Sequence, residues 1–147
     1  MEPGATTKPT ARRRWPRKNA DASSEENRRP LRILVCDDEP HIVRLIQVNL
    51  ERQGYEVITA GDGLESLEKS RTTNPDICIL DITMPHMDGF EVLRKIRRDP
   101  ATEDIFVVIL TTATTDEDRA QGARCGADMY MTKPFSPQGL VDTFVEA

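Results

Sequence analysis

The chain has 147 residues, of which 37% are hydrophobic and 31% charged, and it carries a formal net charge of −5 at pH 7. This length and composition predict one soluble globular domain that can bury a core without disulfides or metal. No apolar run approaches the roughly 18 residues that a membrane helix needs, and the amino-terminal stretch lacks the apolar segment of a secretory signal.

Residues 1–30 differ in composition from the rest of the chain. They hold eight Lys/Arg and four Asp/Glu, whereas residues 31–147 hold twelve and twenty-one. Beyond Met1, only Trp15 offers a large apolar side chain, so this segment cannot offset the entropy lost on ordering. We therefore expect a disordered basic tail over 1–30 and a folded acidic domain over 31–147. The basic run at 12–18 could contact nucleic acid, but we favour a solubilising leader.

The first half of the folded part alternates short apolar runs with stretches of helical spacing. In chain order these segments predict a strand, a helix, a strand and a helix, at 31–36, 40–53, 55–60 and 63–73. Gly54 lies just past the first helix, where helices commonly stop. Asp62 is placed to cap the second helix, and Asn74-Pro75 breaks the chain after it.

The second half continues the alternation. Three strands are predicted at 76–80, 105–110 and 127–131. Each is followed by a predicted helix, at 88–98, 116–124 and 137–147. Asp88 is placed at the start of the first of these helices, and Asp99-Pro100 at its end. A strand–helix unit repeated five times predicts a doubly wound α/β fold, in which helices cover both faces of a parallel sheet.

Polar groups follow four of the five predicted strands. They are Asp37-Asp38, Asp81, Thr111-Thr112 and Thr132-Lys133. The carboxyl ends of parallel strands lie at one edge of the sheet, where folds of this class bind ligands. Each group alone has an ordinary structural explanation, as a turn, a helix cap, a strand residue or a loop lysine. Their joint occurrence at the same end of each strand predicts a site.

The residue types at this edge suit phosphoryl chemistry. Three clustered carboxylates repel one another unless a cation joins them, and Mg²⁺ is a hard cation that prefers oxygen ligands. With Mg²⁺ bound, Asp81 would be an ionised nucleophile, and its attack on phosphorus would give an acyl phosphate. The Lys133 ammonium and the Thr112 hydroxyl could hold the transferred group.

In these residues the chain resembles the CheY-like receiver domain of bacterial response regulators. The matching segments are ILVCDDEP (33–40), PDICILDITMPHMDGFEVLRKIR (75–97), VVILTTA (107–113) and GADMYMTKPF (126–135). The resemblance implies a flavodoxin-like (βα)5 fold with strand order 2-1-3-4-5. It also implies that Asp81 receives a phosphoryl group from a histidine kinase or a phosphotransfer protein.

The resemblance further implies a ligand set for Mg²⁺, made of Asp37, Asp38, Asp81 and the carbonyl of Thr83. Lys133 and Thr112 would hold the phosphoryl oxygens. Thr112 would also move toward the phosphoryl group and Tyr130 would swing inward, although a half-buried core aromatic is the structural alternative for Tyr130. This movement would remodel the surface of the fourth helix, last strand and last helix for an output partner.

Other functions and features are weighed against this one. The chain could be the receiver module of a larger regulator or hybrid kinase, or an aspartyl-phosphate phosphatase. Such phosphatases place a second carboxylate two residues after the nucleophile, where this chain has Thr83. A basic tail without a recognition helix does not favour direct DNA binding. We expect a switch that catalyses only its own phosphorylation and dephosphorylation, with no membrane partner.

The cysteines indicate neither a zinc site nor a disulfide framework. Cys36, Cys78 and Cys125 are widely spaced and form no CxxC pair. Cys36 and Cys78 lie in apolar strands and are expected to act as small buried hydrophobes. This use of cysteine fits a reducing, cytoplasmic setting.

Overall fold

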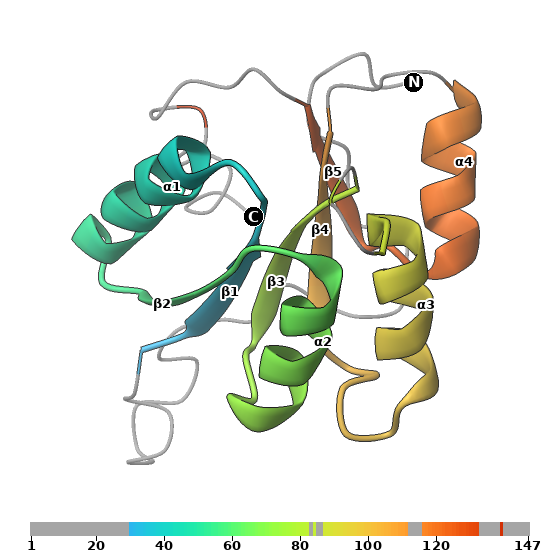
Figure 1. The fold of residues 1–147 in the computed structure, drawn as a ribbon, viewed down its shortest axis with the longest axis horizontal. Helices are drawn as coiled ribbons and strands as arrows, with labels where there is room; N and C mark the ends of the chain where they lie inside the picture. Colours follow the sequence, from blue (N-terminus) through green and yellow to red (C-terminus); the bar gives the residue numbers. More distant parts are fainter. Residues whose placement is uncertain (1–29, 83, 85–86, 112–115, 133–138, 140–147) are drawn as a thin grey trace.

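The computed structural model describes residues 30–82, 84, 87–111, 116–132 and 139. In this part of the chain, strands and helices alternate (Figure 1). The strands are β1 (Arg32–Cys36), β2 (Glu56–Ala60), β3 (Ile77–Asp81), β4 (Phe106–Thr111) and β5 (Met129–Thr132). The helices are α1 (Pro40–Arg52), α2 (Gly63–Thr72), α3 (Gly89–Arg98) and α4 (Asp116–Cys125). The tail over 1–29 and most of the helix predicted over 137–147 lie outside the described residues.

The strands form one parallel sheet in the order β2-β1-β3-β4-β5. Both the parallel arrangement and the implied order are thereby confirmed. Cys36 at the end of β1 lies opposite Ala60 of β2 on one side and Leu80 of β3 on the other. The chain direction across the sheet reverses at β1, so the switch point of this doubly wound sheet lies between the ends of β1 and β3.

Apolar side chains cover both faces of the sheet. Ile33 and Val35 of β1 pack in a cluster with buried residues of α1, whereas Leu34 and Cys36 pack in a second cluster with residues of α3. Figure 1 shows α1 on one side of the sheet and α2 and α3 on the other. Burial on both faces explains why the strands are continuous apolar runs without polar alternation.

Two aspartates cap α2 and α3, the helices that precede and follow β3 along the chain. The Asp62 carboxylate accepts a hydrogen bond from the Glu65 amide at 2.8 Å, and Asp88 accepts one from Glu91 at 2.9 Å. The Glu65 carboxylate in turn accepts a hydrogen bond at 2.9 Å from the amide of Gly61, the residue before the cap. This hydrogen bond, assisted by Lys69, lowers the pKa of the Glu65 carboxyl. The predicted cap at Asp62 and the predicted helix start at Asp88 are confirmed.

The ends of the elements coincide with the predicted ends or differ from them by at most two residues. Gly54 has a φ of 95°, which confirms it as the stop after α1. β3 extends through Asp81, one residue beyond its apolar run, because Asp81 continues the ladder with Leu110 of β4. Within the described residues, no helix is long and apolar enough to cross a membrane.

A buried ion pair joins α3 to the start of β5. Arg97 Nη2 lies 2.7 Å from Asp128 Oδ2, and the two side chains are 12% and 0% exposed. The same carboxylate oxygen accepts a hydrogen bond from the Val107 amide at 2.9 Å. The Arg97 guanidinium also donates to the carbonyls of Gly126 and Ile105. The network thus ties together the amino ends of β4 and β5, at the edge of the sheet opposite to the predicted site.

Candidate functional site

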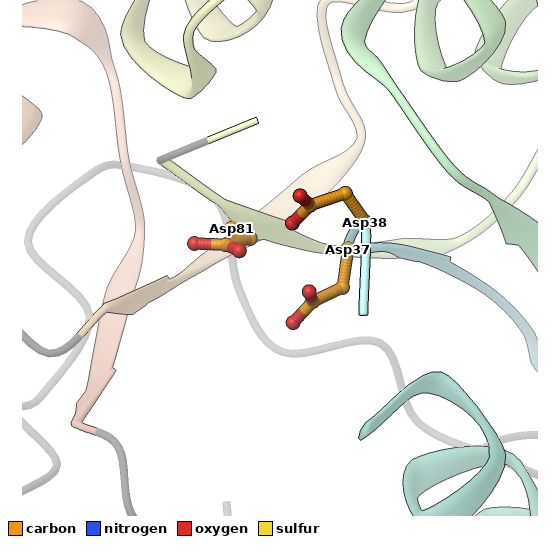
Figure 2. A group of neighbouring side chains, drawn as sticks. All are labelled: Asp37, Asp38 and Asp81. Atoms are coloured by element: carbon orange, nitrogen blue, oxygen red, sulfur yellow. The ribbon is translucent and has the colours of Figure 1, made fainter. Parts of the chain in front are cut away.

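Three carboxylates meet at the carboxyl ends of β1 and β3. Asp81 is the last residue of β3, and Asp37 and Asp38 directly follow β1. One carboxylate oxygen from each residue lies within 4.8 Å of the other two (Figure 2). The fold thus brings together side chains that stand 44 residues apart, between Asp37 and Asp81. The predicted clustering of these three carboxylates is confirmed.

The three carboxylates differ in their exposure to solvent. Asp37 is 1% exposed and Asp81 is 2% exposed, whereas Asp38 is exposed. The backbone holds Asp37 in place, because its amide donates to the Ala60 carbonyl at 3.1 Å and its Oδ1 accepts from the Glu39 amide at 3.0 Å. The site is therefore a partly buried acidic pocket with one side open to water.

This donor set fits Mg²⁺. The ion prefers oxygen ligands and usually keeps several waters alongside one or two carboxylates. Placing buried like charges close together is costly unless a cation compensates them. The exposed position of Asp38 leaves room for waters or for the oxygens of a bound phosphoryl group. Thr83, the fourth ligand implied by the family resemblance, lies outside the described residues.

The first residue of α3 lies close against the backbone at the end of β3. The Gly89 amide donates to the Ile82 carbonyl at 3.0 Å. A Cβ at residue 89 would stand 2.5 Å from Ile82 Cα and 2.7 Å from the Asp81 carbonyl oxygen. Glycine is therefore required at this position by the close approach of α3 to the backbone of Asp81. The sequence motif contains Gly89, but only the structure shows this contact.

Gly89→Ala is expected to lower the free energy of unfolding by about 1–3 kcal/mol, because the added methyl group must displace backbone atoms. Urea denaturation followed by circular dichroism measures the change. Gly61→Ala is the matched control, since a Cβ there meets only Glu65 Oε1 at 3.7 Å. Equal losses in the two variants would contradict a specific steric demand at residue 89.

A cleft of about 270 Å³ opens beside the acidic pocket. Its walls come from the first turns of α1 and the end of β2, and they include Asp37, Asp38, Arg44, Gln47 and Thr59. The sequence motifs did not indicate this cleft, because Arg44 and Gln47 of α1 belong to none of them. It gives solvent and incoming groups access to the carboxylates from the α1 side.

Cys36 of β1 and Cys78 of β3 lie in the apolar cluster that packs against α3. Their Sγ atoms are 3.7 Å apart and both residues are 0% exposed. The hydrogen bond to Cys36, together with burial, raises the pKa of the Cys78 thiol well above its usual value. Both residues are fully buried in the core, which confirms the expectation of small buried hydrophobes.

Tyr130 is the one predicted switch residue that the structure describes. It lies in β5, is 6% exposed, and packs in the cluster shared with α3. Its side chain is thus turned into the core. Thr112 and Lys133, which were expected to hold phosphoryl oxygens, lie outside the described residues.

Comparison with curated proteins agrees with this geometry. The model of the response regulator receiver domain family matches residues 33–144. The alkaline phosphatase synthesis transcriptional regulatory protein PhoP of Bacillus subtilis is 49% identical over 108 residues, covering 73% of this chain and 44% of PhoP. The DNA-binding dual master transcriptional regulator RpaA of Synechocystis is 42% identical over 110 residues, covering 75% of this chain and 46% of RpaA. The chain thus spans less than half the length of these relatives.

Solved structures point the same way. The chemotaxis response regulator CheY4 of Vibrio cholerae aligns with a TM-score of 0.76 and 34% identity, over 80% of this chain and 98% of CheY4. A BeF3-activated DrrB receiver domain aligns with a TM-score of 0.69 and 30% identity, over 80% of this chain and 99% of DrrB. These matches favour a receiver over the aspartyl-phosphate phosphatase. By sequence and by fold, this chain belongs to the response regulator receiver domains of two-component signalling.

Proposed function

We propose that Asp81 is the phosphoacceptor of this domain and that a histidine kinase or a phosphotransfer protein is the donor. One observation carries the proposal: Asp81 ends the central strand β3, with carboxylate oxygens of Asp37 and Asp38 within 4.8 Å of its own. Asp37 and Asp38 leave the neighbouring strand, β1. Asp81 thus lies at the switch point of the sheet, where folds of this class bind their ligands.

The Asp81 carboxylate acts as the nucleophile in the proposed reaction. One of its oxygens bonds to the donor phosphorus while the phosphorus–nitrogen bond of the phosphohistidine breaks. The imidazole nitrogen leaves with the electron pair of that bond and takes up a proton, and an acyl phosphate remains on Asp81. Asp37, Asp38, Asp81 and the Thr83 carbonyl would hold Mg²⁺, which would supply positive charge to the phosphoryl oxygens.

Other residues complete the site in this proposal. Lys133 places an ammonium beside the phosphoryl oxygens and Thr112 donates its hydroxyl to one of them. The domain catalyses only its own phosphorylation and dephosphorylation, and is otherwise a switch in the cytoplasm. Its site is made of side chains that bind and orient a phosphoryl group, and the family to which it belongs supports this role.

We further propose that the phosphorylated domain signals to a protein partner through α4, β5 and the helix predicted over 137–147. Movement of the Thr112 hydroxyl toward the phosphoryl group would leave space that the inward side chain of Tyr130 fills. The buried position of Tyr130, only 6% exposed, supports this part. PhoP and RpaA are named as transcriptional regulators, so transcription is the first output to test.

Uptake of a phosphoryl group from acetyl phosphate in the presence of Mg²⁺ tests the proposal. We expect the intact mass to rise by a single phosphoryl group, and peptide mapping after borohydride reduction to place it on Asp81. EDTA is expected to prevent the uptake, because the clustered carboxylates then remain uncompensated. Modification of Asp37 or Asp38 in place of Asp81, or uptake that EDTA does not reduce, would contradict the assignment.

A further inference from the structure

Helix α4 packs against the rest of the domain partly through a residue that has no side chain. Among the side chains of α4 that the structure describes, Gly122 is buried, Gln121 and Cys125 are half-buried, and the rest are exposed. The helix is therefore polar over most of its surface. Gly122 is the one buried residue among those described in α4, so the backbone itself forms part of the contact surface there.

The Tyr130 side chain occupies the space at Gly122. A Cβ at residue 122 would lie 1.8 Å from the Tyr130 hydroxyl oxygen, 2.6 Å from Cζ and 2.9 Å from Cε1. These separations are far below the van der Waals contact of about 3.5–4.0 Å between carbon atoms. The outer end of the tyrosine ring thus lies directly beneath the backbone of α4.

The backbone of residue 122 does not itself require glycine. Among the described glycines, positive φ angles occur at Gly54 and Gly126, and Gly122 is an ordinary helical residue. Glycine inside a helix costs about 1 kcal/mol relative to alanine. The feature at this position that demands glycine is the tyrosine ring packed against it.

We propose that Gly122 is a positioning residue that allows Tyr130 to turn inward beneath a docked α4. A side chain at residue 122 would leave two arrangements: Tyr130 moves out, or α4 separates from β5. Glycine at residue 122 therefore lets the inward tyrosine and the docked helix occur together in one conformational state. This role rests on the proposed switch function of Tyr130. It makes Gly122 the residue that permits the inward orientation of the tyrosine side chain.

Tyrosine NMR on Gly122→Ala tests the contact directly. The chain contains two tyrosines, so Tyr55→Phe leaves Tyr130 as the sole source of a ¹³C-tyrosine ring signal. In this background we expect Gly122→Ala to shift that signal toward the position of a solvent-exposed tyrosine, with increased broadening by a soluble paramagnetic agent. The signal should stay there after addition of Mg²⁺ and beryllofluoride. Ala123→Ser is the matched control, because it adds one heavy atom at the exposed neighbouring residue.

A double-mutant cycle separates this role from a general packing defect. Gly122→Ala is expected to reduce the folding equilibrium constant roughly tenfold when Tyr130 is present, as overpacked sites do. In a Tyr130→Leu background, which lacks the three clashing atoms, the same change should have no effect or raise stability, since alanine favours the helix. If Gly122→Ala alone does not fold, recovery of folding in the double variant supports the same conclusion.

An unchanged Tyr130 signal in Gly122→Ala, or equal losses in both backgrounds, would overturn the inference. The outcome is independent of whether Asp81 is phosphorylated. Failure of the proposed function would show as absent acetyl phosphate uptake by the parent protein, whereas the ring signal of the unphosphorylated protein still reports the contact at residue 122.

Discussion

Asp81→Asn is expected to remove phosphorylation and, in Mg²⁺-free buffer, to make the domain more stable. The amide of asparagine is not a nucleophile toward phosphorus, so the variant should gain no mass from acetyl phosphate. The gain in stability follows from charge, because three carboxylates with oxygens within 4.8 Å repel one another. Removing one of them relieves a repulsion on the order of 1–3 kcal/mol at the effective dielectric of partly buried sites.

Mg²⁺ should reduce or invert this difference in stability. The parent protein offers three carboxylates and is expected to bind the ion more tightly than the variant. A ligand that binds only the folded state stabilises it by RT ln(1 + [L]/Kd), so the parent protein gains more. Urea denaturation in EDTA and in millimolar Mg²⁺ measures both stabilities, and intact mass reports phosphorylation. A variant less stable than the parent in EDTA would contradict the repulsion.

Asp88→Asn is the matched control for this experiment. It makes the same carboxylate-to-amide change at the exposed cap of α3, where the side chain accepts a hydrogen bond from the Glu91 amide at 2.9 Å. Asparagine caps helices about as well as aspartate. Phosphorylation, and stability in either buffer, should therefore stay close to those of the parent protein.

The sequence alone predicted the sheet and the acidic pocket, because both follow from local patterns. Apolar runs buried on both faces indicate parallel strands, and the aspartates after those runs lie at the same edge for a purely geometric reason. The cap at Asp62 and the helix start at Asp88 were predicted for a similar reason, since a capping side chain contacts an amide only three residues ahead. Strand ends were less predictable, because the ladder of β3 continues past its last apolar residue to Asp81.

Contacts between distant segments were not predicted, and each depends on space or charge that only the fold creates. Gly89 and Gly122 look like ordinary glycines in the sequence, and their need for glycine arises from the backbone of Asp81 and the ring of Tyr130. Arg97 has the pattern of an exposed basic residue in the last turn of a helix. Its partner Asp128 lies 31 residues further along the chain, so no local pattern indicates that the pair is buried.

The Arg97–Asp128 pair leads to the largest loss of stability that we expect from a single substitution. Asp128→Ala would leave the Arg97 guanidinium, 12% exposed, without its carboxylate, and would remove the acceptor of the Val107 amide. Breaking a buried ion pair by removing one partner costs roughly 3–5 kcal/mol. Urea denaturation of the variant against the parent protein measures this loss.

An exposed pair of similar geometry serves as the control. Arg71 Nε lies 2.7 Å from Asp99 Oδ2, but the Arg71 side chain is 63% exposed, so water screens the pair and Asp99→Ala should cost much less. Replacing both buried partners, with Arg97→Met and Asp128→Leu, should recover part of the loss because no charge is left unpaired. Equal losses in Asp128→Ala and Asp99→Ala would contradict a buried network. Because the network joins the amino ends of β4 and β5, folded Asp128→Ala should keep the Mg²⁺ affinity of the parent protein.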